Sequence, residues 1–268
     1  RAADALWSTR HMDDPQVPGR RAVLTLGAAV LVAGCSTPAA ATPPAPAPTP
    51  SRCAPASPAL RSRCVPPAPR ETAGTTPQRH VACGAADVAL TIDDGPDPDW
   101  TPTVLALLAS LDVRATFCVV GRQAASHPGL VADVVHAAHA VANHTWSHRF
   151  LARARAGVVR DEVGRATDLI TKVAGVRPRH FRAPGGQWSR SVLAECRAQG
   201  LAPLDWSVDP RDWSRPGVDA ITRTILTTTR PGSIILEHDG GGDRSQTVQA
   251  LRVALPRLLD QGYRFVQP

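Results

Sequence analysis

From about residue 81 to the end of the chain, short strand-like runs alternate with amphipathic helical stretches, and this alternation limits the fold more than any other feature. Residues 88–92 are almost wholly apolar, whereas residues 158–173 carry apolar side chains at helical spacing. Strands that alternate with helices indicate βα units and a parallel sheet. Because about seven units follow one another in about 188 residues, the sequence predicts an α/β fold, a distorted (β/α)7-type barrel.

The predicted elements can be given in chain order. Strands are expected at residues 88–92, 115–120, 140–142, 179–182, 202–206, 233–236 and 263–266. Helices are expected at residues 101–111, 130–138, 158–173, 191–199, 218–227 and 246–259. In a barrel of this kind the active site lies in the loops after the C-terminal ends of the strands, so polar residues at those ends are the functional candidates.

Two pairs of polar residues at predicted strand ends suggest a metal site. His144 and His148 are four residues apart, so in a helical turn both imidazoles would project from one face and could share a metal. Asp93 and Asp94 are adjacent, so one can bind the metal while the other faces a bound water. Two imidazoles and one carboxylate leave open positions for water and substrate. Taken singly, each motif is weak, since Asp-Asp-Gly-Pro is also typical of a simple turn.

Together with three further segments, these pairs resemble a known family. Five segments resemble, in order, the five motifs of the polysaccharide deacetylases, the NodB-homology fold of carbohydrate esterase family 4. They are Thr91–Pro96, His144–His148, Arg182–Gly186, Asp209–Trp213 and Leu236–His238. The resemblance covers about residues 86–267, and it implies a metal-dependent hydrolase that acts on an acetylated polysaccharide.

The resemblance also implies a role for each residue of the metal site. In the first motif of this family the earlier Asp is the general base and the second is a metal ligand. Asp93 therefore corresponds to the base, and Asp94 to the ligand beside His144 and His148. The expected cofactor is one divalent metal, typically Zn²⁺, which lowers the pKa of the attacking water and stabilises the oxyanion.

The remaining catalytic assignments come from the later motifs. Arg182 resembles the arginine that orients the catalytic Asp. His238 matches the general acid that protonates the leaving amine, with Asp212 or Asp209 as the carboxylate that raises the pKa of its imidazole.

The substrate-binding residues include one departure from the family pattern. Trp213 and Leu236 would line the pocket for the acetyl methyl group, and Pro184 and Gly185 would contact the substrate. The position after Pro184 is often Tyr in this family, so Gly185 keeps the backbone N–H assigned to the oxyanion hole but loses an aromatic wall of the sugar groove. Ile92 stands where Phe is common, which alters packing rather than chemistry.

Tryptophans near the motif loops are further candidates for contact with a sugar. Trp146, Trp188 and Trp213 could stack on a sugar ring, although a Trp is by default a residue of the core or of a groove wall.

The first 35 residues have the pattern of an export signal. The only methionine is Met12, so we expect residues 1–11 to lie upstream of the true start. The pair Arg20-Arg21 precedes the apolar run 22–33, and the small residues that follow end in Cys35, which resembles a lipobox in which this Cys is lipidated. The arginine pair also resembles a twin-arginine signal, and a short buried helix with a chance Cys is the alternative.

A tether and a catalytic domain are predicted to follow. Residues 36–70 contain 11 prolines and almost no large apolar side chain, so residues 36–80 are expected to be a disordered tether before a domain at 81–268. The chain has a net charge of +7, but residues 1–80 carry nine Arg against four acids, and only +2 remains for the domain. A nearly neutral domain disfavours nucleic acid as a partner.

These features together predict an exported protein anchored to the outer face of the bacterial membrane through Cys35, and we expect a monomer. The favoured activity is N-acetylglucosamine deacetylation of peptidoglycan, because the tether would place the domain against the cell wall. The alternatives are a chitooligosaccharide deacetylase or an acetylxylan esterase with the same catalytic groups. A non-catalytic carbohydrate-binding module is disfavoured, since no catalytic group of the motifs is missing.

Overall fold

The computed structural model describes residues 76–82 and 84–268. The predicted export signal of residues 1–35, the predicted lipidation of Cys35 and the part of the predicted tether up to residue 75 lie outside the described residues. In the part of the chain that the structure describes, no helix is both long enough and apolar enough to cross a membrane.

Seven strands and seven helices alternate along the described residues. The strands are β1 (Asp87–Asp93), β2 (Thr116–Val119), β3 (Ala140–Asn143), β4 (His180–Phe181), β5 (Ala202–Pro203), β6 (Ile234–His238) and β7 (Arg264–Phe265). The helices are α1 (Thr101–Ser110), α2 (Gly121–Ser126), α3 (Pro128–His136), α4 (Ala156–Ala174), α5 (Arg190–Ala198), α6 (Val218–Thr228) and α7 (Ser245–Asp260). Two short 3₁₀ turns, η1 (Pro184–Gly186) and η2 (Asp212–Ser214), follow β4 and β5.

The strands form a parallel sheet that curls back on itself. Their order is β5-β4-β3-β2-β1-β6, and β7 pairs with the start of β1. The chain just after β5 then meets β6, because Val208 forms a parallel bridge with Ile235 and accepts a hydrogen bond from the backbone N–H of Leu236 at 2.9 Å. The predicted distorted βα barrel is therefore confirmed.

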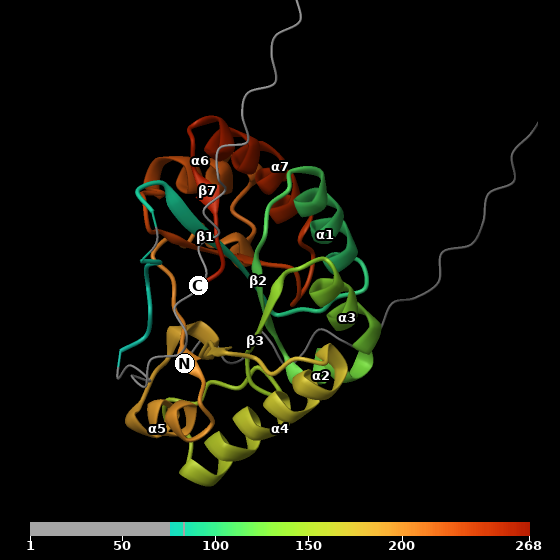
Figure 1. The fold of residues 1–268 in the computed structure, drawn as a ribbon, viewed down its shortest axis with the longest axis vertical. Helices are drawn as coiled ribbons and strands as arrows, with labels where there is room; N and C mark the ends of the chain where they lie inside the picture. Colours follow the sequence, from blue (N-terminus) through green and yellow to red (C-terminus); the bar gives the residue numbers. More distant parts are fainter. Residues whose placement is uncertain (1–75, 83) are drawn as a thin grey trace, which may run out of the picture. The chain divides into compact units, whose positions relative to one another are not determined.

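The helices surround this sheet. Figure 1 shows α1, α3 and α2 along one side of the strands, α4 and α5 below them, and α6 and α7 above. Contacts close much of the ring, since α7 packs on α1, α1 on α3, α3 on α4, and α4 on α5.

Alternation along β1 separates two cores. Leu90 and Ile92 belong to the large cluster in which the sheet packs against the helices. Ala89 belongs to a small cluster made mainly by strand residues, among them Cys118 and Ala142. Because successive side chains point to opposite faces, Thr91 and Asp93 share the inner face with Ala89. The small inner residues leave room for polar side chains near the strand ends.

The structure differs from the sequence predictions in two helical segments. The region 121–136 holds two helices, and the sequence predicted only the second. Residues 146 and 147 form bends, and residues 145–148 contain no helical turn that would bring two imidazoles onto one face. Thr145 and His148 have φ values of 69° and 59°, in the left-handed region, so the backbone turns twice within this loop.

The folded unit begins earlier than the predicted domain boundary at residue 81. Gln78 pairs with Leu204, and the Arg79 guanidinium forms an ion pair of 2.9 Å with Asp205. A tether predicted for residues 36–80 would accordingly end before Gln78.

Candidate active site

The polar residues of the five motifs meet at the C-terminal ends of the parallel strands. Asp93 ends β1, His144 follows β3, and His238 ends β6. The register pairs Asp93 with His238 across β1 and β6, which places the two residues side by side on neighbouring strands. Parallel strands thus bring together side chains that lie up to 145 residues apart in the sequence.

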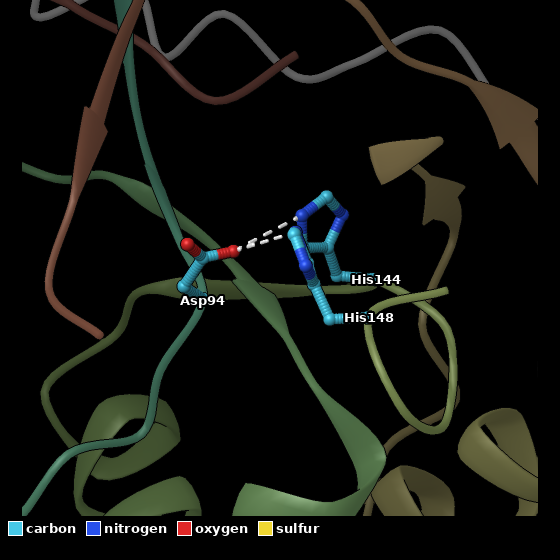
Figure 2. A group of neighbouring side chains, drawn as sticks. All are labelled: Asp94, His144 and His148. Atoms are coloured by element: carbon cyan, nitrogen blue, oxygen red, sulfur yellow. Dashed lines mark ion pairs between the residues drawn. The ribbon is translucent and has the colours of Figure 1, made fainter. Parts of the chain in front are cut away.

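Asp94, His144 and His148 form a group that can hold a metal ion. One ligand atom from each residue lies within 4.8 Å of the others. The Oδ1 atom of Asp94 is 3.4 Å from Nε2 of His144 and 3.1 Å from Nε2 of His148. Figure 2 shows both imidazoles directed at this one carboxylate oxygen.

Hydrogen bonding supports the assignment of these atoms as ligands. Nδ1 of His144 lies 2.9 Å from the backbone carbonyl of Arg182, which can only accept, so Nδ1 carries the proton and Nε2 keeps its lone pair. Oδ1 of Asp94 is buried, and its neighbours are the Nε2 atoms of His144 and His148. One carboxylate oxygen and two imidazole nitrogens that meet at one point are a donor set that a divalent cation fits.

Two buried residues hold the histidine loop on the body of the protein. The side-chain amide of Asn143 donates to the carbonyl of Val163 and to Thr167 on α4, both at 2.8 Å, and its Oδ1 accepts from the N–H of Thr145. The carboxylate of Glu162 accepts from the N–H and the hydroxyl of Ser147 at 2.8 and 2.7 Å. These contacts fix both sides of a loop whose backbone is in left-handed conformations.

The side chain of Asp93 lies between the metal group and a buried arginine. Its Oδ1 accepts a hydrogen bond of 2.7 Å from Nη1 of Arg182, and its Oδ2 is 3.7 Å from Nε2 of His144. Arg182 is fully buried, and it also donates to the hydroxyl of Thr91 and to the carbonyl of Asp205. Asp93 is therefore held in one orientation, with one oxygen turned toward the metal group.

His238 is held from the other side by Asp212. The Nδ1 atom of His238 lies 2.7 Å from Oδ1 of Asp212, so Nδ1–H donates to the carboxylate and Nε2 is left for the site. The other oxygen of Asp212 accepts from the backbone N–H of His238 and from the Thr247 hydroxyl. Asp209, the second candidate for this position, instead accepts from the N–H of Arg211 within its own turn.

The charges of the site act on one another. Burial alone would lower the pKa of His238, but the Asp212 carboxylate outweighs it and raises the pKa to about 9. Burial alone would raise the pKa of Asp94, but the charge of His148 and the nearness of both histidines hold it well below its usual range. The charge of His238 also lowers the pKa of Asp94 and of His148, as expected because His238 is the register partner of Asp93 at the same end of the sheet.

The residues predicted to bind substrate lie around this centre with different exposure. Leu236 is buried in β6, two residues before His238 and on the same face of the strand. Trp213 is 47% exposed, and the Arg211 guanidinium lies 5.1 Å from the centre of its ring. Pro184 is buried, and Gly185 follows it in η1 with a φ of 62°. Trp146 and Trp188 are partly buried against the two larger core clusters.

Several supporting residues were not predicted from the sequence. They are Thr91, Asn143, Glu162 and Thr247. The sequence did indicate a role for Glu162, because it lies next to the apolar face of a predicted helix. A charged side chain is buried in such a place only when it has hydrogen-bonding partners. Thr247 had no signal, since a threonine on a helix is ordinary.

Comparison with known proteins gives consistent matches. Residues 81–204 match the family model described as Polysaccharide deacetylase. The chain is 45% identical over 192 residues to a chitooligosaccharide deacetylase of Bradyrhizobium sp. (strain ANU 289), which covers 67% of this chain and 88% of the relative. It is 39% identical over 181 residues to a peptidoglycan-N-acetylglucosamine deacetylase of Bacillus cereus, with 67% and 84% covered. The crystal structure of a peptidoglycan N-acetylglucosamine deacetylase superposes with a TM-score of 0.69 at 34% identity, covering 71% of this chain and 89% of that one.

Proposed function

Because the chain belongs to the polysaccharide deacetylase family, we propose that it hydrolyses N-acetyl groups of an amino-sugar polymer, with peptidoglycan N-acetylglucosamine as its substrate. The observation that carries the proposal is the arrangement of three groups around one point. A carboxylate held by Arg182 and an imidazole held by Asp212 flank a buried set of metal ligands. A carbohydrate-binding module that only binds sugar does not need a base, an acid and metal ligands.

The ligand set favours zinc as the cofactor. Asp94, His144 and His148 supply two imidazole nitrogens and one carboxylate oxygen, the donor types found in catalytic zinc sites. A divalent ion held there supplies a Lewis acid that polarises the acetyl carbonyl and lowers the pKa of water beside it.

The proton transfers are assigned to the side chains on either side of the ligand set. Asp93, held by Arg182, accepts a proton from the water that adds to the acetyl carbon. His238, protonated because Asp212 raises its pKa to about 9, donates a proton to the amide nitrogen as the C–N bond breaks. The products are acetate and a free amino group on the sugar.

One expectation and one observation bear on which polymer is the substrate. The export signal and tether expected from residues 1–80 would place the domain beside the cell wall, which favours peptidoglycan. The relative at 45% identity is a chitooligosaccharide deacetylase, and this favours a chitin-like oligomer as the second candidate.

The test is acetate release from acetylated peptidoglycan and from chitooligosaccharides, measured in parallel with and without a chelator. Asp93→Asn and the metal-stripped protein should each lose at least about a hundredfold in rate, because the base or the Lewis acid is gone. The exposed Asp99 lies in the loop that follows Asp93, so Asp99→Asn is the matched control and should keep the wild-type rate.

An undiminished rate in Asp93→Asn or in the stripped protein would falsify the mechanism. A higher kcat/KM on chitooligosaccharides than on peptidoglycan would replace the first substrate with the second.

A further inference from the structure

Phe150 is an exposed aromatic residue at the edge of the metal group, and it is neither a metal ligand nor one of the proton-transfer residues. Within the described residues, the exposed large hydrophobic side chains are Phe150, Val176, Trp213 and Val253. The ring of Phe150 is 38% exposed, and its centre lies 6.1 Å from that of His148. An exposed apolar ring this close to a buried polar centre calls for an explanation other than core packing.

Gly185 makes room for this ring. A Cβ atom at position 185 would lie 3.0 Å from Cε1 of Phe150, which is tighter than most Cβ contacts, and at an ordinary contact distance of 3.7 Å from Cδ1 and Cζ. One edge of the ring therefore occupies the space where a side chain at position 185 would begin. The ring comes from the loop that joins β3 to α4, whereas Gly185 follows β4.

The backbone on either side of Phe150 is fixed. His148, two residues earlier, belongs to the ligand set and has a φ of 59°. Leu151, the next residue, is fully buried in the core cluster that contains Val159 and Phe181, and its carbonyl accepts from the N–H of Ala154 at 2.9 Å. A ring held between two fixed points loses little conformational entropy when a ligand packs on it.

We propose that Phe150 is a substrate-binding residue whose ring packs against the sugar that carries the acetyl group. This inference rests on the proposed function for its choice of ligand. A pyranose ring has an apolar face of C–H groups, and binding sites combine aromatic walls of this kind with a few polar groups that fix orientation. Phe150 lies beside His148 and Gly185, so a sugar against its ring has its substituents within reach of the metal group.

The experiment measures binding of a chitin tetramer by calorimetry to zinc-loaded protein, in an Asp93→Asn background that prevents turnover. Phe150→Ala should raise the Kd about tenfold, which corresponds to about 1.4 kcal/mol. Phe150→Tyr should bind like the parent, because it keeps the ring. Val253→Ala removes a similarly exposed apolar side chain from α7 and should leave the Kd unchanged.

Three results would overturn the inference. They are an unchanged Kd in Phe150→Ala, no tetramer binding by the parent, and a loss of bound zinc in Phe150→Ala, which would mean that the ring only supports His148.

Acetate release by the otherwise wild-type protein separates this inference from the proposed function. If that protein releases no acetate while tetramer binding still depends on Phe150, the proposed function fails and the sugar contact stands. If it releases acetate and Phe150→Ala has the same kcat/KM on oligomers, the sugar contact fails and the proposed function stands.

Discussion

Asp212 is the residue on which the acid of this centre depends. It is buried and accepts from the ring of His238, from the backbone N–H of His238 and from Thr247. These contacts keep its negative charge beside the imidazole, so His238 stays protonated up to about pH 9. As pH rises through that value the acid form is lost, and kcat/KM should fall.

Replacing Asp212 by Asn should move this decline to lower pH. Without the carboxylate, burial remains as the main influence and lowers the pKa of His238. The expected result is an alkaline limb of the pH–kcat/KM profile that begins at least about one pH unit earlier, measured on a soluble acetylated oligomer. Asp209→Asn is the control, since Asp209 contacts its own turn. An identical shift in both variants would argue against the pairing of Asp212 with His238.

The sequence predicted which residues gather at the metal group but not the contacts that support them. The motifs identified Asp94, His144 and His148, and the structure brings them together. The choice between Asp209 and Asp212 could not be made from spacing, because it depends on how η2 lies against the end of β6. Only the tertiary structure shows which of the two aspartates pairs with His238.

At the scale of elements, α4 acts as the support of the histidine loop. Glu162 is buried on this helix and accepts two hydrogen bonds from Ser147, the residue before His148. The carbonyls of Thr145 and Trp146 accept hydrogen bonds from the backbone of α2, and Glu162 adds the contacts that hold the loop just before His148.

Glu162→Ala should weaken zinc binding about tenfold or more, as is usual when a group that orients a metal ligand is removed. The matched control is Asp161→Ala, which removes an exposed carboxylate on the same helix that only pairs with Arg165 at the surface. Zinc affinity is measured by competition with a chromogenic chelator. Equal affinities in the two variants would show that α4 does not support the loop.

The elements themselves followed from periodicity wherever they were long or strongly patterned. The buried strand β1 and the amphipathic helix α4 lie where the sequence predicted them. The short helix α2 was missed because its six residues, Gly121–Ser126, carry no apolar repeat. The helical turn considered for residues 145–148 does not form, because Thr145 adopts a left-handed backbone that β-branched residues rarely take.

At the scale of the whole molecule, the net charge of +7 says little about the catalytic domain. Residues 1–80 carry five of these charges. The active-site residues therefore lie in a nearly neutral domain.

We propose that this segment attaches the protein to the outer face of the membrane through Cys35. Cys35→Ala should shift the protein from the membrane fraction to the soluble fraction of fractionated cells. Acetate release from soluble oligomers should be unchanged, since the substitution lies outside the catalytic domain. A variant that stays with the membrane would show that attachment does not need this thiol.

Arg182 contacts the base with its side chain and a metal ligand with its backbone, and this difference matters for related proteins. Its guanidinium holds Asp93, whereas its carbonyl orients His144. Any amino acid at this position supplies a carbonyl, but only arginine supplies the planar fork. A related protein with another residue in place of Arg182 would lose the group that holds Asp93, and hence its hydrolase activity. It could still bind the metal ion. Retention of metal is therefore weak evidence of activity among descendants of such a gene.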